Sequence, residues 1–264
     1  MKVLISALIV FLLSVIPTEA ARRVAVVKYG DHERNRMIIS MPEEGKGNAV
    51  VVWFHGGGLK SGEPYIPEEL LDTDYIIVAP AYRLLPDVDI DACIEDAADA
   101  VASVFGNIEN FGGDKEKIFV AGHSAGGYLA SMIGLDKSRL AKKGIDANAI
   151  AGLFPVSGQA ITHYEWRKMT GGSDLQPTID QYAPIYHIRK DASPYIIICG
   201  DRELELLGRY EENAYMWRMM RLIGHPDVSI YEIGGHNHGD MVRPAMHIIK
   251  DHIKRLLDTK KAAR

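Results

Sequence analysis

The segment VAGHSAGGYLA, residues 120–130, places a serine where it could act as a nucleophile. Ser124 has Gly122 and Gly126 two residues away on either side, and a helical pattern follows it. A serine on a sharp strand-to-helix turn is held near positive φ, a strained backbone that requires small neighbours. Such a turn lifts Oγ above the sheet, beside a helix N-terminus that favours a developing negative charge.

A serine hydroxyl is a weak nucleophile until a base and an acid activate it, and candidates for both follow later strands. The segment GGHNHG, residues 234–239, offers His236 and His238 as the base. The segment GDRE, residues 200–203, offers Asp201 and Glu203 as the acid. The chain order serine, acid, histidine strengthens the prediction that Ser124 is catalytic.

Alternating strand and helix patterns must position these residues. The expected strands are apolar runs at residues 24–29, 37–41, 49–54, 75–79, 118–121, 150–155, 195–199 and 228–233. Apolar residues spaced by three and four predict helices over 90–104, 128–135, 210–222 and 245–257. This alternation predicts a mostly parallel sheet between helices, with any ligand bound at the carboxyl ends of the strands.

Four segments together resemble the α/β-hydrolase superfamily and, within it, esterases related to hormone-sensitive lipase. They are HGGG at 55–58, PAYRLLP at 80–86, FGGDKEKIFVAGHSAGG at 111–127 and the late GHNHG. The resemblance implies an α/β-hydrolase fold with a mostly parallel eight-stranded sheet flanked by helices. Related esterases carry an N-terminal helical cap, whereas residues 21–48 precede the HGGG strand here and read as two strands. We therefore expect no large cap domain, and the remaining lid candidate is the segment 158–193.

The resemblance also implies a role for each site residue. Ser124 would be the nucleophile, and the GHNHG pattern places His238 at the base position, with His236 as the alternative. Relatives commonly read Gly-Asp-x-Asp after the acid strand, so Glu203 would be the acid. Asp201 is the alternative acid, and if it is not the acid it is expected to hold the turn.

The oxyanion hole implied by the resemblance comes from the backbone N–H groups of Gly57, Gly58 and Ala125. His123 and His55 are expected to be structural. A further group of histidines lacks the spacing of metal ligands, so we expect no metal and no cofactor; these are His163, His187, His225, His247 and His252.

Composition and the amino terminus bound the setting of the protein. The chain has 264 residues, a net charge of −5 and no basic cluster, which argues against nucleic acid as a partner. Residues 1–20 read as a cleavable signal peptide with cleavage near Ala20, which leaves one domain at 21–264 without a stable membrane anchor. The protein is then secreted or periplasmic. Cys93 and Cys199 could pair outside the cell, although their apolar surroundings favour two buried free thiols.

The expected activity is that of a serine carboxylic-ester hydrolase acting on short-chain or aromatic acyl esters. Export and the missing cap suit a bulky substrate such as an acylated polysaccharide, from which acetyl or feruloyl groups would be released. The alternatives are a lipase or peptidase of the same superfamily, or a non-catalytic binding module on the hydrolase scaffold. The acyl group, the alcohol and the oligomeric state do not follow from the sequence.

Overall fold

A computed structural model describes residues 22–206 and 208–262 of the chain. Eight strands form one sheet in the order β1-β2-β4-β3-β5-β6-β7-β8. The strands are β1 (Arg22–Lys28), β2 (Arg36–Pro42), β3 (Asn48–Phe54), β4 (Ile76–Pro80), β5 (Gly113–His123), β6 (Gly152–Val156), β7 (Tyr195–Gly200) and β8 (Val228–Ile233). The pairs β1–β2 and β2–β4 are antiparallel, and every other pair is parallel.

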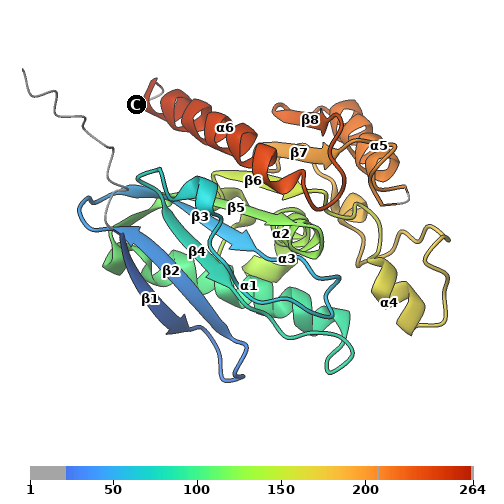
Figure 1. Ribbon diagram of the computed structural model, residues 1–264, viewed down its shortest axis with the longest axis horizontal. Helices are drawn as coiled ribbons and strands as arrows, with labels where there is room; N and C mark the ends of the chain where they lie inside the picture. Colours follow the sequence, from blue (N-terminus) through green and yellow to red (C-terminus); the bar gives the residue numbers. More distant parts are fainter. Residues whose placement is uncertain (1–21, 207, 263–264) are drawn as a thin grey trace, which may run out of the picture.

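Helices cover both faces of this sheet (Figure 1). They are α1 (Ile90–Asn107), α2 (Ala125–Leu135), α3 (Lys137–Ala141), α4 (Tyr164–Met169), α5 (Arg209–Leu222) and α6 (Val242–Ala262). Alternate residues of β3 explain the two layers: Val50 and Val52 belong to a core with α1, α2 and α5, whereas Val51 and Trp53 pack in a second core with α6. A strand buried on both faces must be apolar throughout, as the run AVVVWF is.

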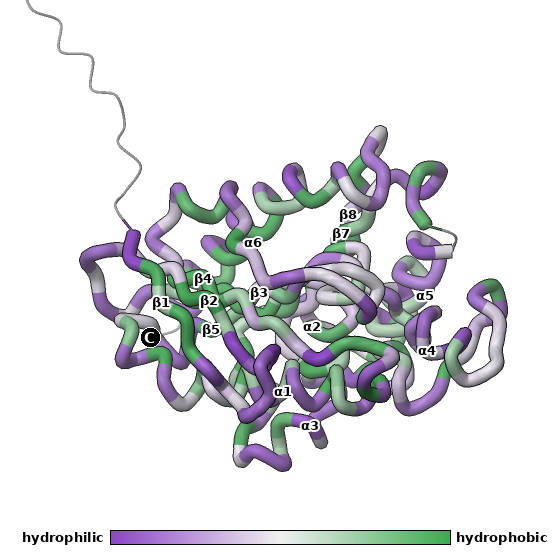
Figure 2. The backbone as a smooth tube through the Cα atoms, turned by 60° about the horizontal axis from the view of Figure 1, so that its bottom comes forward, coloured by the Kyte–Doolittle hydropathy of each residue, from purple (hydrophilic) through white to green (hydrophobic). Residues whose placement is uncertain are grey.

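The apolar segments lie in the middle of the molecule and the polar ones around it (Figure 2). Cys93 on α1 and Cys199 on β7 are both buried and free, as predicted. Each predicted strand and helix is present. The strand β5 begins at Gly113, earlier than the apolar run at 118 indicated, because Gly113 already pairs with Asn48 and the polar residues 114–117 continue the strand. In the described part of the chain, no helix is long and apolar enough to cross a membrane.

Two features of the fold leave the carboxyl ends of the parallel strands accessible. The residues before β3 form β1 and β2, an antiparallel pair at one edge of the sheet, in place of a helical cap. Between β6 and β7 the chain forms only the six-residue helix α4 and one short 3-10 helix, Pro184–His187. The predicted signal peptide, with its cleavage site near Ala20, lies outside the described residues.

Candidate active site

Ser124 joins β5 to α2 with a backbone conformation that side chains rarely adopt. Its φ is 56° and its ψ is −117°, and its N–H donates to the Val156 carbonyl at 2.8 Å. The flanking residues must be glycines, because a side chain at either position would overlap the backbone. A Cβ on Gly126 would lie 2.0 Å from the Phe54 carbonyl oxygen, and one on Gly122 would lie 2.4 Å from the Gly126 carbonyl carbon. The crowded turn predicted from the sequence is therefore present, and it presents Ser124 at the carboxyl end of the sheet.

A chain of hydrogen bonds connects the Ser124 hydroxyl to a buried carboxylate. His238 Nε2 lies 2.9 Å from Ser124 Oγ, and His238 Nδ1 lies 2.8 Å from Glu205 Oε2. Because an ionised carboxylate only accepts hydrogen bonds, the proton of the neutral imidazole resides on Nδ1 and the Nε2 lone pair faces Ser124. The other candidate, His236, is half-buried, and its Nδ1 contacts the Gly234 carbonyl at 3.1 Å.

The structure corrects the predicted acid, because Glu205 and not Glu203 contacts the histidine. The Asp201 carbonyl accepts the N–H groups of Leu204 at 2.9 Å and Glu205 at 2.8 Å, so the chain turns tightly after β7. This turn leaves Glu203 exposed and brings Glu205 back to the site. Asp201 holds the turn, as the alternative reading expected: its carboxylate accepts from Glu203 N and Gly235 N, at 2.9 Å and 2.7 Å.

Ser157, which sequence reasoning missed, completes this cluster. It follows β6 directly, is fully buried and has a positive φ of 47°. Its Oγ donates to Glu205 Oε1 at 2.6 Å and lies 2.9 Å from His238 Nδ1. A polar residue just past the end of a buried strand was the signal available in the sequence, the same signal that marked Ser124.

The cluster also sets the charge of its members. Burial alone would raise the pKa of Glu205, but hydrogen bonds from His238, Ser157 and the Gly200 N–H lower it to about 2. Burial lowers the pKa of His123 to about 4, so its ring is neutral. His123 Nε2 then donates to the His238 carbonyl at 2.8 Å, which fixes the loop that carries His238 and agrees with the structural role predicted for His123.

The glycine-rich loop after β3 lies against Ser124. A Cβ on Gly56 would be 3.3 Å from the Ser124 Cβ, and Gly57 and Gly58 have positive φ values of 108° and 65°. Ala125 is the first residue of α2, so its N–H has no carbonyl partner within the helix. The three predicted oxyanion donors therefore belong to segments that border the nucleophile, and their catalytic use stays a prediction.

The loop is supported from below by His55. Its ring stacks on Tyr82 with 4.4 Å between ring centroids, and burial lowers its pKa to about 4. The Tyr82 hydroxyl donates to the His55 carbonyl at 2.9 Å. These contacts give His55 the structural position that the sequence predicted.

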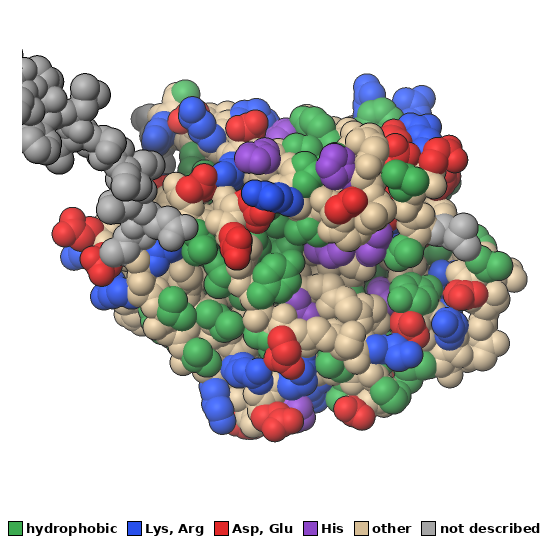
Figure 3. Space-filling model, in the orientation of Figure 1, with side chains coloured by type: hydrophobic (Ala, Val, Ile, Leu, Met, Phe, Trp, Pro, Cys, Tyr) green, Lys and Arg blue, Asp and Glu red, His purple; other side chains and the backbone are tan. Residues whose placement is uncertain are grey.

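The segment 158–193 borders the site without covering it. Trp166 and Tyr182 pack edge to face at 6.1 Å, and Tyr186 is exposed. Tyr164 reaches the glycine-rich loop, since its hydroxyl lies 3.0 Å from a Cβ built on Gly58. Figure 3 shows histidine side chains in a hollow near the centre of one face of the molecule.

Solved structures share this architecture over nearly the whole chain. A truncated carbohydrate esterase from gut microbiota superposes with a TM-score of 0.74 at 15% identity, covering 91% of this chain and 98% of its own. Thermogutta terrifontis esterase 2 superposes with a TM-score of 0.71 at 20% identity, covering 91% and 96%. The predicted α/β-hydrolase fold is thereby confirmed.

Sequence relatives are esterases that match over part of their length. Esterase LipC of Mycobacterium tuberculosis is 26% identical over 212 residues, which cover 71% of this chain and 50% of LipC. Isoprenylcysteine alpha-carbonyl methylesterase of Arabidopsis thaliana is 32% identical over 123 residues, 45% of this chain and 29% of that protein. The chain thus spans half or less of the curated relatives described. The BD-FAE family profile matches residues 37–206, which include the glycine-rich loop, Ser124 and Glu205, and the chain belongs to the BD-FAE family.

Proposed function

We propose that the protein is a serine carboxylic-ester hydrolase that acts through an acyl-enzyme. The observation that supports this most directly is the hydrogen-bonded series from Ser124 Oγ through His238 to Glu205, with spacings of 2.9 Å and 2.8 Å. Serine esterases require this combination of nucleophile, base and orienting acid. Family membership and the esterase relatives agree with the assignment.

In the proposed reaction, Ser124 Oγ attacks the ester carbonyl carbon while His238 Nε2 accepts the hydroxyl proton. The carbonyl oxygen gains negative charge and receives hydrogen bonds from backbone N–H groups of Gly57, Gly58 and Ala125. The tetrahedral intermediate collapses, and the alkoxide leaves as an alcohol with the proton from His238. Water then attacks the acyl-enzyme by the same steps and releases the acid. Glu205 stabilises the imidazolium ion formed in each half-reaction.

For the substrate, we propose short-chain or aromatic acyl esters, including acetyl or feruloyl groups carried by polysaccharides. The absence of a helical cap in the described residues supports a bulky substrate, and the name of one structural neighbour is that of a carbohydrate esterase. We also propose export, supported by the pattern of residues 1–20; a mature amino terminus near Ala21 is the observation that checks it.

Hydrolysis of nitrophenyl acetate by the wild type and by Ser124→Ala tests the activity. We expect the variant to lose activity by about 10⁴-fold or more, because the acyl-enzyme cannot form. Equal rates for the wild type and Ser124→Ala would leave only the interpretation of the protein as a non-catalytic binding module. Acetylated xylan, feruloyl esters and nitrophenyl esters of increasing chain length then define the substrate, and a preference for long acyl chains would contradict the proposed class.

A further inference from the structure

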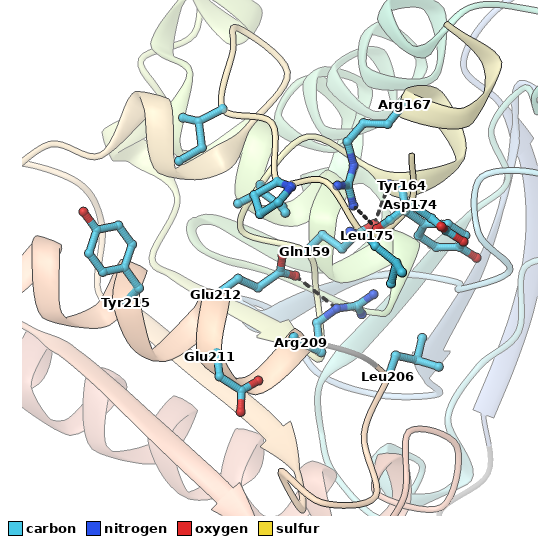
Figure 4. Close-up of a pocket in the computed structure, with 14 residues that line it drawn as sticks. Gln159, Tyr164, Arg167, Asp174, Leu175, Leu206, Arg209, Glu211, Glu212 and Tyr215 are labelled. Atoms are coloured by element: carbon cyan, nitrogen blue, oxygen red, sulfur yellow. Dashed lines mark hydrogen bonds and ion pairs between the residues drawn. The ribbon is translucent and has the colours of Figure 1, made fainter. Parts of the chain in front are cut away.

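A pocket of about 630 Å³ lies beside the candidate active site, between the segment after β6 and the start of α5 (Figure 4). Two of its lining residues connect it to that site. The Tyr164 hydroxyl lies 3.0 Å from a Cβ built on Gly58, and the N–H of Leu206 donates to Glu205 Oε2 at 3.1 Å. A group attached to an ester at Ser124 could therefore extend into this pocket.

The rim of the pocket is apolar. Leu175, Ile179, Leu206 and Tyr215 line it, and each of these side chains is exposed, from 44% for Leu206 to 69% for Leu175. Exposed large apolar side chains gathered around one concavity are a common mark of a ligand site. They offer a surface for a carbon chain or a ring.

The floor of the pocket is cationic. Arg209 and Arg167 are only 3% and 5% exposed. Arg209 has a carboxylate partner: its Nε lies 3.1 Å from Glu212 Oε1, and its Nη1 donates to the Ser157 carbonyl. The floor thus contains two buried guanidinium groups and one buried carboxylate, and that carboxylate is paired with Arg209.

Arg167 lacks such a partner. Its two Nη atoms donate to the carbonyl oxygens of Asp174, at 3.1 Å, and Gln176, which are neutral groups. Its Nε is buried and has no hydrogen-bond acceptor, and no carboxylate of the described residues forms an ion pair with it. Figure 4 shows the guanidinium reaching into the space between Gln159 and Leu175. A buried charge without a counter-ion is unfavourable, and an acceptor carried by a ligand would relieve this.

We propose that this pocket binds a carboxylate group of the ester substrate, with Arg167 as its counter-ion. This inference rests on the proposed esterase activity. The apolar rim would hold the chain or ring that separates the carboxylate from the scissile ester, while the buried floor strengthens the ion pair by excluding water. The preferred substrates are then esters with a free carboxylate on either the acyl or the alcohol half.

Matched pairs of charged and neutral esters distinguish the two halves. Mono-nitrophenyl adipate and its methyl ester place the charge on the acyl half; acetoxybenzoate and its methyl ester place it on the alcohol half. In at least one pair, we expect the wild type to favour the charged ester by about 10-fold or more in kcat/KM, the usual size of a charge-assisted contact. Ratios near one in both pairs would overturn the inference.

Arginine variants locate the effect. Arg167→Met should lower the charged-to-neutral ratio by about 10-fold, whereas Arg243→Met, at an exposed arginine of α6, should leave it unchanged. An equal fall in both variants would contradict a specific role of Arg167. If Arg167→Met does not fold, Leu175→Lys and Leu175→Glu at the rim should raise and lower the ratio, and the same ratio in both would also contradict the inference.

Direct binding separates this inference from the proposed function. If the wild type hydrolyses no ester at all, the proposed activity fails, yet binding of monomethyl adipate can still be measured by titration calorimetry. Weaker binding to Arg167→Met than to the wild type would support the pocket, and equal or absent binding would overturn it.

Discussion

Two glutamates that follow β7 in the chain have pKa values shifted in opposite directions. Glu205 belongs to the candidate active site, and Glu212 belongs to the floor of the neighbouring pocket. Hydrogen bonds from His238, Ser157 and Gly200 outweigh the effect of burial on Glu205 and lower its pKa to about 2. At Glu212, burial outweighs the attraction of Arg209 and the Ala160 N–H, and raises the pKa to about 7.

The difference shows how each region is completed. In the candidate active site the protein itself supplies partners for the carboxylate, so charge and geometry are fixed before a substrate arrives. In the pocket the floor is incompletely paired, with a buried Nε of Arg167 that has no acceptor. The catalytic cluster is preorganised, whereas the floor of the pocket beside it has an unsatisfied cationic group. This arrangement is expected where one region performs the reaction and the adjacent region selects the substrate.

The largest effect on activity is expected when the charge of Glu205 is removed. Glu205→Gln should lower kcat on nitrophenyl acetate on the order of 10³-fold or more, because the amide can present the wrong hydrogen-bonding group to His238 Nδ1. Glu203→Gln is the matched control and should retain wild-type kcat, since Glu203 is exposed and its side chain does not contact His238. Steady-state kinetics of both variants, with circular dichroism to confirm folding, gives the answer. A large loss in Glu203→Gln with none in Glu205→Gln would restore the original assignment.

Glu203 and Glu205 also show which parts of the structure could be predicted from the sequence. The strands could be predicted because buried parallel strands are apolar throughout, and the corner at Ser124 because its glycines are forced by contacts as short as 2.0 Å. The prediction that Glu203 is the acid was wrong because it depended only on the spacing of the Gly-Asp-x-Asp pattern in relatives. The turn stabilised by the Asp201 carbonyl moves the inward position to Glu205, and such a turn is set by tertiary hydrogen bonds.

Neither the role of Ser157 nor the pocket could be predicted from the sequence, for a related reason. Ser157 is brought to Glu205 by pairing of β6 with β7, and nothing in its neighbours 155–158 specifies a carboxylate partner. The importance of Arg167 lies in an unpaired buried Nε, which depends on where the segment 173–177 folds back on α4. Satisfaction of polar groups is a property of three-dimensional packing and has no local sequence pattern.

A smaller effect is expected from Ser157, a positioning residue in the network of Glu205. Ser157→Ala and Ser157→Gly both remove the hydroxyl that donates to Glu205 Oε1, while only glycine relieves the positive φ of 47°. Loss of a hydrogen bond to a charged group costs about 1.5–3 kcal/mol, so kcat should fall about 10- to 100-fold in both variants with little change in KM.

Comparison of these two variants separates the hydroxyl from backbone strain. If the hydroxyl matters, alanine and glycine lower kcat equally, although the glycine variant can differ in its melting temperature. Wild-type kcat in Ser157→Gly, together with a reduced value in Ser157→Ala, would assign the effect to strain and contradict the positioning role.

The smallest expected effect is a pH dependence that only the pocket should show. Between pH 8 and pH 6, Glu205 stays ionised, whereas Glu212 gains a proton as the pH falls through about 7. Arg209 and Arg167 face Glu212 from α5 and α4, together with the Ala160 N–H. Protonation of Glu212 therefore leaves the floor more positive, and a carboxylate substrate should bind more tightly at the lower pH.

The measurable quantity is the ratio of kcat/KM for mono-nitrophenyl adipate to that for its methyl ester. Both esters depend on the same catalytic cluster, so its titration cancels in the ratio, and the adipate carboxylate is ionised throughout this range. We expect the ratio to rise about 3-fold from pH 8 to pH 6, a change of roughly 0.6 kcal/mol. Glu212→Gln should flatten this dependence, because the amide is neutral at every pH and its oxygen can still accept from Arg209. A wild-type ratio that stays constant or falls toward pH 6 would mean that Glu212 does not tune the floor, and that the difference between the two glutamates has no consequence for substrate choice.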